Sequence, residues 1–359
     1  MTDLLTNIRG KIETGSRISD AEALALFETD DLLGIGELAA LANRNRNGDK
    51  VFFNVNRHIN YTNICVNRCA FCAFSREQGE TGGYTLTLQE IRQRAREAAD
   101  AGATEIHMVG GLHPELPFAF YLEMLEAIKQ DRPRLHIKAF TAVEIDYFSE
   151  VAELSIERVV ERLKQAGLDS LPGGGAEILG QQVRDQLCAE KISGERWLEV
   201  TELVHNAGLR SNATMLFGHV EQAADRVDHL RRLRELQDRT GGFQTFIPLA
   251  FQPDNTRISK ACGVGGVDVL KTLAISRIYL DNFRHVKAYW VMLGLKIAQV
   301  ALAFGVNDLD GTVIEEQIGH DAGADSPQAL SKERLIEMIR KAGRIPVERD
   351  TLYNELRTY

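Results

Sequence analysis

The sequence predicts an α/β protein whose main body is a (β/α)8 barrel of the TIM type. From about residue 51 onward, short strand-like segments alternate with amphipathic helical segments, as in βαβ units around a parallel sheet. About eight strands fit within residues 51–311, and that length is close to the roughly 250 residues of such a barrel. No Pro-rich or low-complexity stretch divides the region. A doubly wound open sheet is the alternative fold for the same alternation.

The individual elements follow from periodicity and from their end signals. Strands are expected at 58–62, 105–109, 136–140, 169–171, 210–215, 243–248, 286–291 and 308–311. Helices are expected between them, at 88–101, 118–129, 155–166, 194–207, 224–236, 267–280 and 295–304. Thr87 and Glu90 have the spacing of a capping box. Gly102, Gly167 and Gly208 stand where helices would end.

The chain is expected to have three regions. Residues 1–50 form a helical N-terminal extension, with one helix after Ser19 or Asp20 and a second at about 35–43. Residues 51–311 form the barrel. Residues 312–359 form a C-terminal extension that packs on the barrel and contains one amphipathic helix, at 332–341.

The composition excludes several classes of protein. The chain has 359 residues, of which 44% are hydrophobic and 26% charged, as in ordinary globular proteins. A net charge of −9 argues against general nucleic-acid binding and against docking on anionic membranes. Neither a signal peptide nor an apolar run of about 20 residues is found. The protein is therefore expected in the cytoplasm, with no nucleic-acid or membrane partner.

Three of the five cysteines form a candidate metal site. Cys65, Cys69 and Cys72 are spaced C-x3-C-x2-C and directly follow the first barrel strand. In barrels, the loops after the strands form the active-site face. Three thiolates can hold three irons of a cubane, and the fourth iron, without a protein ligand, can bind a substrate. The alternatives are a zinc site with His58 as fourth ligand and a cluster that only carries or senses electrons. Cys188 and Cys262 are expected to be structural.

Polar groups and glycines follow several of the other strands. Glu144 can either bind a ligand or cap the next helix. Arg210 and Asn212 share one face of their strand with Thr214, and an inward Arg210 would need an anionic partner. The remaining candidates are Gly110 and Gly111 after the second strand and the glycine run that precedes Glu177 after the fourth.

The cysteine spacing, together with the barrel pattern, resembles the radical S-adenosylmethionine (radical SAM) superfamily. The resemblance implies a [4Fe–4S] cluster on the three cysteines and S-adenosylmethionine as co-substrate. It further implies a set of contacts to S-adenosylmethionine. Phe71 would pack on the adenine, Gly110 and Gly111 would meet the methionyl amine, Glu144 and Glu177 would bind ribose or amine, and Gly218 would lie near the adenine.

One branch of that superfamily matches over nearly the whole chain from about residue 50. The matching segments are His58–Cys65, Val109–Pro114, Lys138–Ile145, Leu171–Ile178, Ala213–His219, Phe246–Phe251 and Arg344–Asp350. They resemble the futalosine-pathway enzymes of menaquinone biosynthesis and their deazaflavin-synthase relatives. Aminofutalosine synthase is the favoured member. The sister cyclase typically has Asn where His113 stands, Pro-Pro-Glu where Ala142–Glu144 stand and Trp-Thr where Leu249–Ala250 stand.

The resemblance implies a transferase that adds the 5′-deoxyadenosyl radical to 3-[(1-carboxyvinyl)oxy]benzoate. The product would be 6-amino-6-deoxyfutalosine, with loss of bicarbonate. A low-potential electron donor of flavodoxin or ferredoxin type would be the partner. The expected contacts to the small anionic aromatic substrate are His58, His113, Lys138, Arg210, Asn212 and His219. Dehypoxanthine futalosine cyclase and a deazaflavin (FO) synthase-type enzyme are the alternative activities.

Overall fold

The structure, a computed structural model, describes residues 3–258 and 263–359. Seven parallel strands form a curled sheet in the order β2-β3-β4-β5-β6-β7-β8. They are β2 (Asn56–Ile59), β3 (Glu105–Met108), β4 (His136–Ala139), β5 (Ser170–Leu171), β6 (Arg210–Phe217), β7 (Phe243–Ala250) and β8 (His285–Val286). Each strand pairs in parallel with its successor in the chain.

The segment that begins with β9 (Asp308–Gly311) bridges the two edges of this sheet. Asp308 pairs with Lys287 beside β8, and Ile314 pairs with Arg57 in β2, both in parallel. The backbone N–H of His58 donates to the Ile314 carbonyl at 2.8 Å. Eight strand segments therefore surround the axis, and the predicted barrel-type fold is confirmed over the doubly wound alternative.

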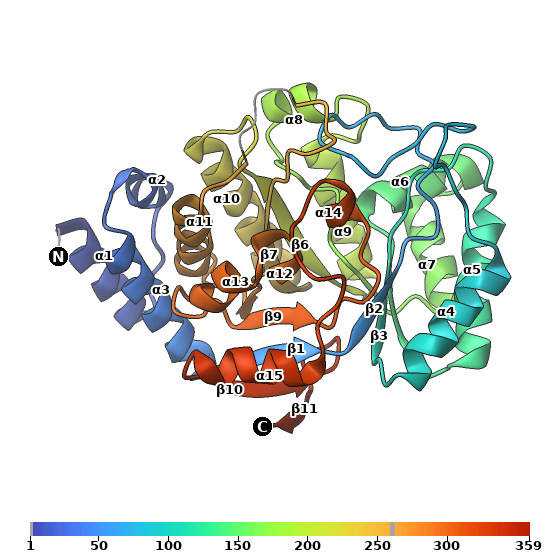
Figure 1. Cartoon of the computed structure of the whole chain (residues 1–359). Coiled ribbons are helices and arrows are strands. Elements are labelled where there is room, and N and C mark those ends of the chain that lie inside the picture. The colour runs from blue at the N-terminus through green and yellow to red at the C-terminus, as the bar shows by residue number, and fades with distance from the viewer. Residues whose placement is uncertain (1–2, 259–262) are drawn as a thin grey trace.

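A second, four-stranded sheet covers one end of the barrel (Figure 1). Its order is β11-β10-β1-β9, and its strands are β1 (Lys50–Asn54), β9 (Asp308–Gly311), β10 (Ile345–Arg349) and β11 (Glu355–Thr358). β1 pairs in parallel with β10 on one side and with β9 on the other, and β11 runs antiparallel to β10. Segments from before and after the barrel are thus joined in one sheet.

Helices cover the outside of the barrel (Figure 1). The first three precede it: α1 (Asp3–Thr14), α2 (Asp20–Glu28) and α3 (Leu32–Asn47). Those that alternate with the strands are α4 (Leu88–Asp100), α5 (Phe118–Asp131), α6 (Ala142–Ala152), α7 (Ile156–Ala166), α8 (Gln181–Leu187), α9 (Gly194–Asn206), α10 (Ala223–Thr240), α11 (Gly266–Tyr279), α12 (Trp290–Leu293) and α13 (Leu295–Ala301). The last two are α14 (Ile318–Asp321) and α15 (Lys332–Lys341).

Local signals in the sequence account for several helix ends. Thr87 and Glu90 form the predicted capping box at the start of α4. Gly167 ends α7 with φ +115°, a conformation that L side chains rarely adopt. α15 begins and ends where its amphipathic pattern predicted.

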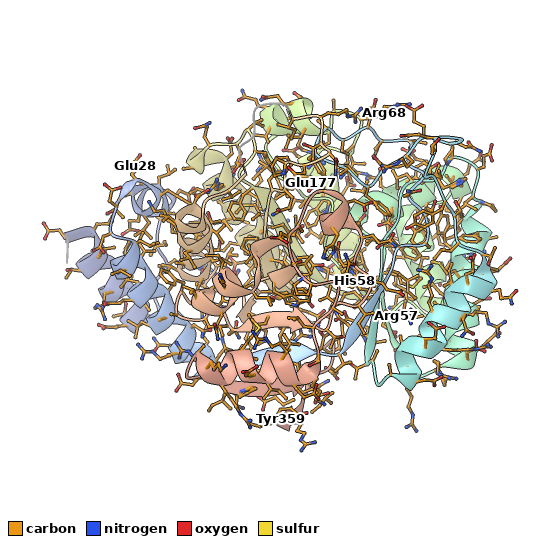
Figure 2. All side chains as sticks on the ribbon, viewed as in Figure 1. Glu28, Arg57, His58, Arg68, Glu177 and Tyr359 are labelled. Carbon is orange, nitrogen blue, oxygen red and sulfur yellow. The ribbon has the colours of Figure 1, made fainter. Side chains whose placement is uncertain are left out.

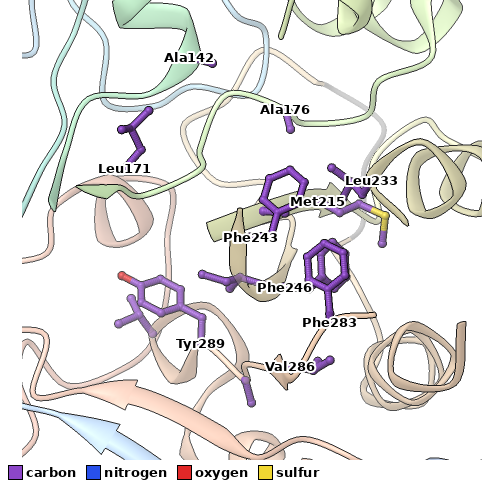
Figure 3. Packing of buried hydrophobic residues seen from close by; sticks show 14 of the residues in the cluster. Ala142, Leu171, Ala176, Met215, Leu233, Phe243, Phe246, Phe283, Val286 and Tyr289 are labelled. Atoms are coloured by element: carbon purple, nitrogen blue, oxygen red, sulfur yellow. The ribbon is translucent and has the colours of Figure 1, made fainter. Parts of the chain in front are cut away.

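The main core lies between the strands and the surrounding helices (Figure 3). Phe243 and Phe283 stack at 5.3 Å between ring centroids, and Phe246 meets Phe283 edge-on at 6.3 Å. The N-terminal helices join this core, because α3 packs on α11 and α2 packs on α10 and α11. Within the described residues, no helix is both long and apolar enough to span a bilayer.

Strand register decides which side chains share a layer inside the barrel. His58 of β2 stands opposite His107 of β3, and His107 stands opposite Lys138 of β4. Side chains in register on neighbouring parallel strands point to the same face. These three residues therefore form one row across three strands.

Candidate active site

A cavity of about 320 Å³ lies at the carboxyl ends of the barrel strands. Its walls come from the loops after β2, β3, β4 and β5, from the last residues of β6 and β7, and from the segment around α14. This is the face on which barrel enzymes build their active sites. The cavity is therefore the candidate active site.

The cysteine segment forms one wall of the cavity. All three of its cysteines are lining residues: Cys65, Cys69 and Cys72. The backbone N–H of Cys65 donates to the Arg76 carbonyl at 3.0 Å, and its Sγ accepts backbone N–H groups from Leu112 and Asn67. Burial raises the pKa of the Cys65 thiol, although these hydrogen bonds oppose the rise. Iron binding at this thiol would therefore release a proton.

The donor set fits a cubane with one open iron. A cubane needs its thiolates on separate irons, so they need not converge on one point. Within residues 3–258 and 263–359, no three His, Cys, Asp or Glu side chains are grouped to hold a single metal ion. A group of ligands for the alternative zinc site, with His58 as fourth ligand, is therefore not present in the described part of the chain.

Cys188 lies next to the cysteine segment, which its isolated place in the sequence did not indicate. It follows α8, is buried, and shares a hydrogen bond with the Cys69 thiol. That bond raises the pKa of Cys69 and lowers the pKa of Cys188 to about 7. Ala70 also donates its backbone N–H to the Leu187 carbonyl at 2.7 Å, so α8 is tied to the segment. Cys262 lies outside the described residues.

Lys191 and Glu177 form an ion pair in the cavity wall. Nζ of Lys191 lies 2.8 Å from Oε1 of Glu177 and 5.2 Å from the centre of the Phe71 ring. Burial would raise the pKa of Glu177, but the lysine charge outweighs it and the pKa is lowered. Burial likewise opposes the charge on Lys191, yet Cys69 and Glu177 raise its pKa. Both side chains are therefore charged at neutral pH.

Gly110 and Gly111 allow the loop after β3 to approach the cysteine segment. A Cβ on Gly111 would lie 2.2 Å from the Ile64 carbonyl oxygen, and one on Gly110 would lie 2.7 Å from the Tyr61 ring. Real Cβ contacts are never that short, so a side chain at either position would require a shift. The backbone N–H of Gly110 donates to Oε1 of Glu144 at 3.3 Å.

Glu144 caps a helix and lines the cavity, so the helix-cap reading of the sequence is confirmed and its contact with a ligand stays a prediction. With Thr141 it forms the capping box of α6. Its Oε1 accepts the Tyr61 hydroxyl at 2.5 Å, and its Oε2 accepts the Thr141 backbone N–H at 2.7 Å. Burial raises the pKa of Glu144 although these donors oppose the rise.

His58 and His107 form the deep part of the cavity lining. Their rings stack at 4.3 Å between centroids, with 14° between the planes. Burial lowers the pKa of His58 and lowers that of His107 well below 6.5. Both imidazoles are therefore neutral at neutral pH. In Figure 2, His58 lies well below Glu177, another lining residue.

Three predicted substrate contacts lie away from the cavity lining. Lys138 is buried but its Nζ is bound to Glu105 at 2.8 Å. Arg210 is exposed at the first residue of β6, the end of the strand opposite to the cavity, and it hydrogen-bonds the Gly241 carbonyl. Asn212 is buried on β6, between Arg210 and the residues of this strand that reach the cavity. On this strand, Thr214 and Leu216 reach the cavity instead.

The other predicted positions outside the lining are engaged in local turns. Nδ1 of His113 accepts the Glu115 backbone N–H at 3.1 Å. His219 Nε2 lies 2.9 Å from the Leu216 carbonyl oxygen. Gly218 has φ +90° and donates its N–H to Glu221 at 2.6 Å. The contacts of His219 and Gly218 shape the loop after β6, whereas the contact of His113 lies in the loop after β3.

Several lining residues were missed by sequence reasoning. Lys191 and Glu316 lie in irregular segments, where no periodic pattern indicates which way a side chain points. His107 stands opposite His58 through the register of β2 and β3, which a single sequence does not report. Asp310 lies in the segment expected as the last strand, 308–311, and it lines the cavity and pairs with Lys287 at 3.1 Å.

Comparison with known proteins identifies the family of this chain. The family description "Radical SAM superfamily" matches residues 59–233, and "CofH/MqnC C-terminal region" matches residues 240–358. Aminodeoxyfutalosine synthase of Thermus thermophilus is 46% identical over 99% of this chain and 96% of that protein, and the Streptomyces coelicolor enzyme of that name is 43% identical over 99% and 95%. A 5-amino-6-(D-ribitylamino)uracil–L-tyrosine 4-hydroxyphenyl transferase of Methanopyrus kandleri is 43% identical over 87% and 86%, and the cyclic dehypoxanthine futalosine synthase of S. coelicolor is 37% identical over 98% and 89%.

Solved structures support the fold. The hydrogenase maturase HydG of Carboxydothermus hydrogenoformans superposes with a TM-score of 0.75 at 20% identity, over 97% of this chain and 80% of that one. Methylornithine synthase (PylB) superposes with a TM-score of 0.75 at 16% identity, over 94% and 97%. Members of the matched superfamily use a [4Fe–4S] cluster and S-adenosylmethionine, and they need a reductant and a small-molecule substrate. Three cysteines line the barrel cavity, and relatives match 99% of the chain. This chain therefore belongs to the radical SAM superfamily and is a transferase-type radical SAM enzyme.

Proposed function

We propose that this enzyme joins the 5′-deoxyadenosyl group of S-adenosylmethionine to 3-[(1-carboxyvinyl)oxy]benzoate and forms 6-amino-6-deoxyfutalosine for menaquinone biosynthesis. One molecule each of S-adenosylmethionine, substrate and water gives one each of product, methionine, bicarbonate and a proton, without net oxidation. The observation that carries the proposal is the 46% and 43% identity to two aminodeoxyfutalosine synthases over 99% of this chain.

The chemistry needs a cluster, a co-substrate and a dry space for a radical. When bound, a [4Fe–4S] cluster with an open iron would supply the electron for reductive cleavage of the C5′–S bond of S-adenosylmethionine. Cys65, Cys69 and Cys72 are the proposed ligands. The apolar side chains of Leu216 and Ile247 line the space beside them and would keep water from the reacting carbon.

The proposed contacts to S-adenosylmethionine lie around the cysteine segment. Phe71, Gly110, Gly111, Glu144 and Glu177 all line the cavity, as an adenosyl and methionyl site requires. Lys191 provides a positive charge that can pair with the methionyl carboxylate. Because Lys191 already pairs with Glu177, it stays charged and ordered before any ligand arrives.

Two positions support the synthase over its sister cyclase. Val143 and Leu249 stand where the cyclase typically has Pro and Trp, and both line the cavity. Leu249 is smaller than the Trp at this position in the cyclase, so it leaves more of the cavity open. His113, the third position of this set, lies outside the lining and carries less weight.

The test is an anaerobic assay of the cluster-loaded enzyme with each candidate substrate, with products identified by mass. The synthase reaction should give 6-amino-6-deoxyfutalosine and methionine in equal amounts, with a reduced flavodoxin or ferredoxin as donor. Turnover of dehypoxanthine futalosine alone would assign the cyclase activity. Coupling of L-tyrosine to 5-amino-6-(D-ribitylamino)uracil alone would assign the activity of the Methanopyrus relative. Either result would refute the proposal.

A further inference from the structure

We propose that the stacked imidazoles of His58 and His107 bind the benzoate carboxylate of the substrate and set its direction in the cavity. The proposal rests on the function proposed above and adds to it the group that positions the aromatic end. It concerns positioning residues at the bottom of the cavity, away from the cysteine segment.

The surroundings of His58 and His107 have the features of a ligand-binding site. His58 is 5% exposed, and its Nε2 is buried without a hydrogen-bond partner among the described residues. A buried nitrogen without a partner has lost its hydrogen bonds to water, so a partner supplied by a ligand is favourable. His107 is less buried because its ring faces the cavity. Stacking and strand register hold the two rings side by side.

The charged groups around the two rings are already balanced. Asp310 pairs with Lys287 at 3.1 Å, and Glu105 pairs with Lys138 at 2.8 Å. Glu316 lies 3.0 Å from Nδ1 of His320 and accepts the Gly319 backbone N–H at 2.9 Å. The neighbouring carboxylates therefore leave the imidazole N–H groups available to an incoming anion.

The chemistry of the substrate then fixes which carboxylate reaches the pair. The vinyl carbon must lie beside the adenosyl group, at the level of the cysteine segment. The benzoate carboxylate stands on the far side of the aromatic ring from that carbon. His58 lies on β2 itself, whereas the cysteines lie in the loop beyond the end of β2. Since a strand advances about 3.3 Å per residue, the histidines occupy the distant end.

The test compares the substrate with two analogues, each with one carboxylate replaced by a carboxamide. Wild-type enzyme should prefer the true substrate over the benzamide analogue by about 10- to 100-fold in kcat/KM, the usual range for a hydrogen bond to a charged group. His58→Phe and His107→Phe keep a flat ring for stacking and should abolish that preference. His107→Gln keeps an N–H donor and should restore part of it. His205→Gln removes a buried imidazole outside the lining and should leave the preference unchanged.

The remaining readouts separate this inference from the proposed function. Iron content should match the wild type in each Phe variant, because neither ring is expected to touch the cluster. If wild type converts the substrate but the Phe variants keep the preference, this inference is wrong and the proposed function stands. If the variants lose only the preference against the vinyl-carboxamide analogue, the pair binds the other carboxylate and the inference is overturned. A wild type that converts none of the three compounds refutes both proposals.

Discussion

Lys138 offers a sharp test, because sequence and structure give it different roles. The sequence predicted a contact to a substrate carboxylate, whereas the structure shows its Nζ bound to Glu105 with both side chains at most 3% exposed. Replacing Lys138 by Met removes the cation and leaves a buried carboxylate with two neutral donors, Thr351 at 2.7 Å and Asn54 at 3.2 Å. We expect lower stability and an unchanged KM.

The size of the loss can be worked out. Removing one partner of a buried ion pair costs about 3–5 kcal/mol. At about 2.1 cal/mol/K of unfolding entropy per residue, 359 residues give roughly 0.75 kcal/mol/K. The Lys138→Met variant should therefore melt roughly 4–7 °C below the wild type. Adding Glu105→Gln should recover most of this, because a neutral amide keeps its bonds to Thr351 and Asn54.

Thermal unfolding followed by circular dichroism measures both variants. The matched control is Lys129→Met, whose pair with Asp169 is 22% and 34% exposed and should contribute about 1 kcal/mol or less. Burial opposes the charge on Glu105, but Lys138 holds its pKa well below 4.5, so the pair contributes fully above pH 4.5 and less as the pH falls below it. The deficit of Lys138→Met should shrink on acidification. An unchanged melting temperature with a KM raised tenfold or more would refute this reasoning.

Three further predictions concern the cavity wall and its surroundings. Cys69→Ala should lower the iron content well below the roughly four per chain of a cubane, whereas Cys188→Ala should retain it; equal losses would make Cys188 a ligand. The hydrogen bond to Glu316 raises the pKa of His320 to about 9, so its stabilisation is complete below pH 6.5 and is lost between pH 6.5 and 9; melting temperatures of His320→Gln should lack that decline, and a parallel decline would contradict the assignment. Gly111→Ala would bring a Cβ to 2.2 Å from the Ile64 carbonyl oxygen, so S-adenosylmethionine binding measured by calorimetry should weaken at least tenfold, and wild-type affinity would contradict the close approach.

The sequence was most informative where the chemistry depends on local spacing. The three cysteines, the helix-cap position of Glu144 and the glycine pair after β3 are short-range patterns, and the structure places all of them at the cavity. Pairs of residues that are far apart in the sequence could not be recognised from the sequence alone. Lys138 looked like a free cation because its partner Glu105 lies on the neighbouring strand. Arg210 looked inward because alternation identifies the face of a strand but not its depth along the axis.

The residues that sequence reasoning missed take their positions from contacts between elements that are distant in the sequence. Lys191 and Glu316 belong to irregular segments, and their positions depend on how α8 and α14 pack against the barrel. His107 and Asp310 belong to strands whose register becomes known only with the neighbours in place. Pairwise register is therefore the information that a single sequence lacked here.

The parallel pairing of β1 with β10 has a consequence for biosynthesis. Residues 50–53 must wait for residues 345–348 to emerge from the ribosome before their hydrogen bonds form. Such distant contacts are costly to close and slow to form. During most of translation β1 therefore offers an unpaired edge, which is the kind of surface that aggregates or recruits chaperones. Expression yield should consequently respond to substitutions in β10 that leave the assembled catalytic cavity untouched.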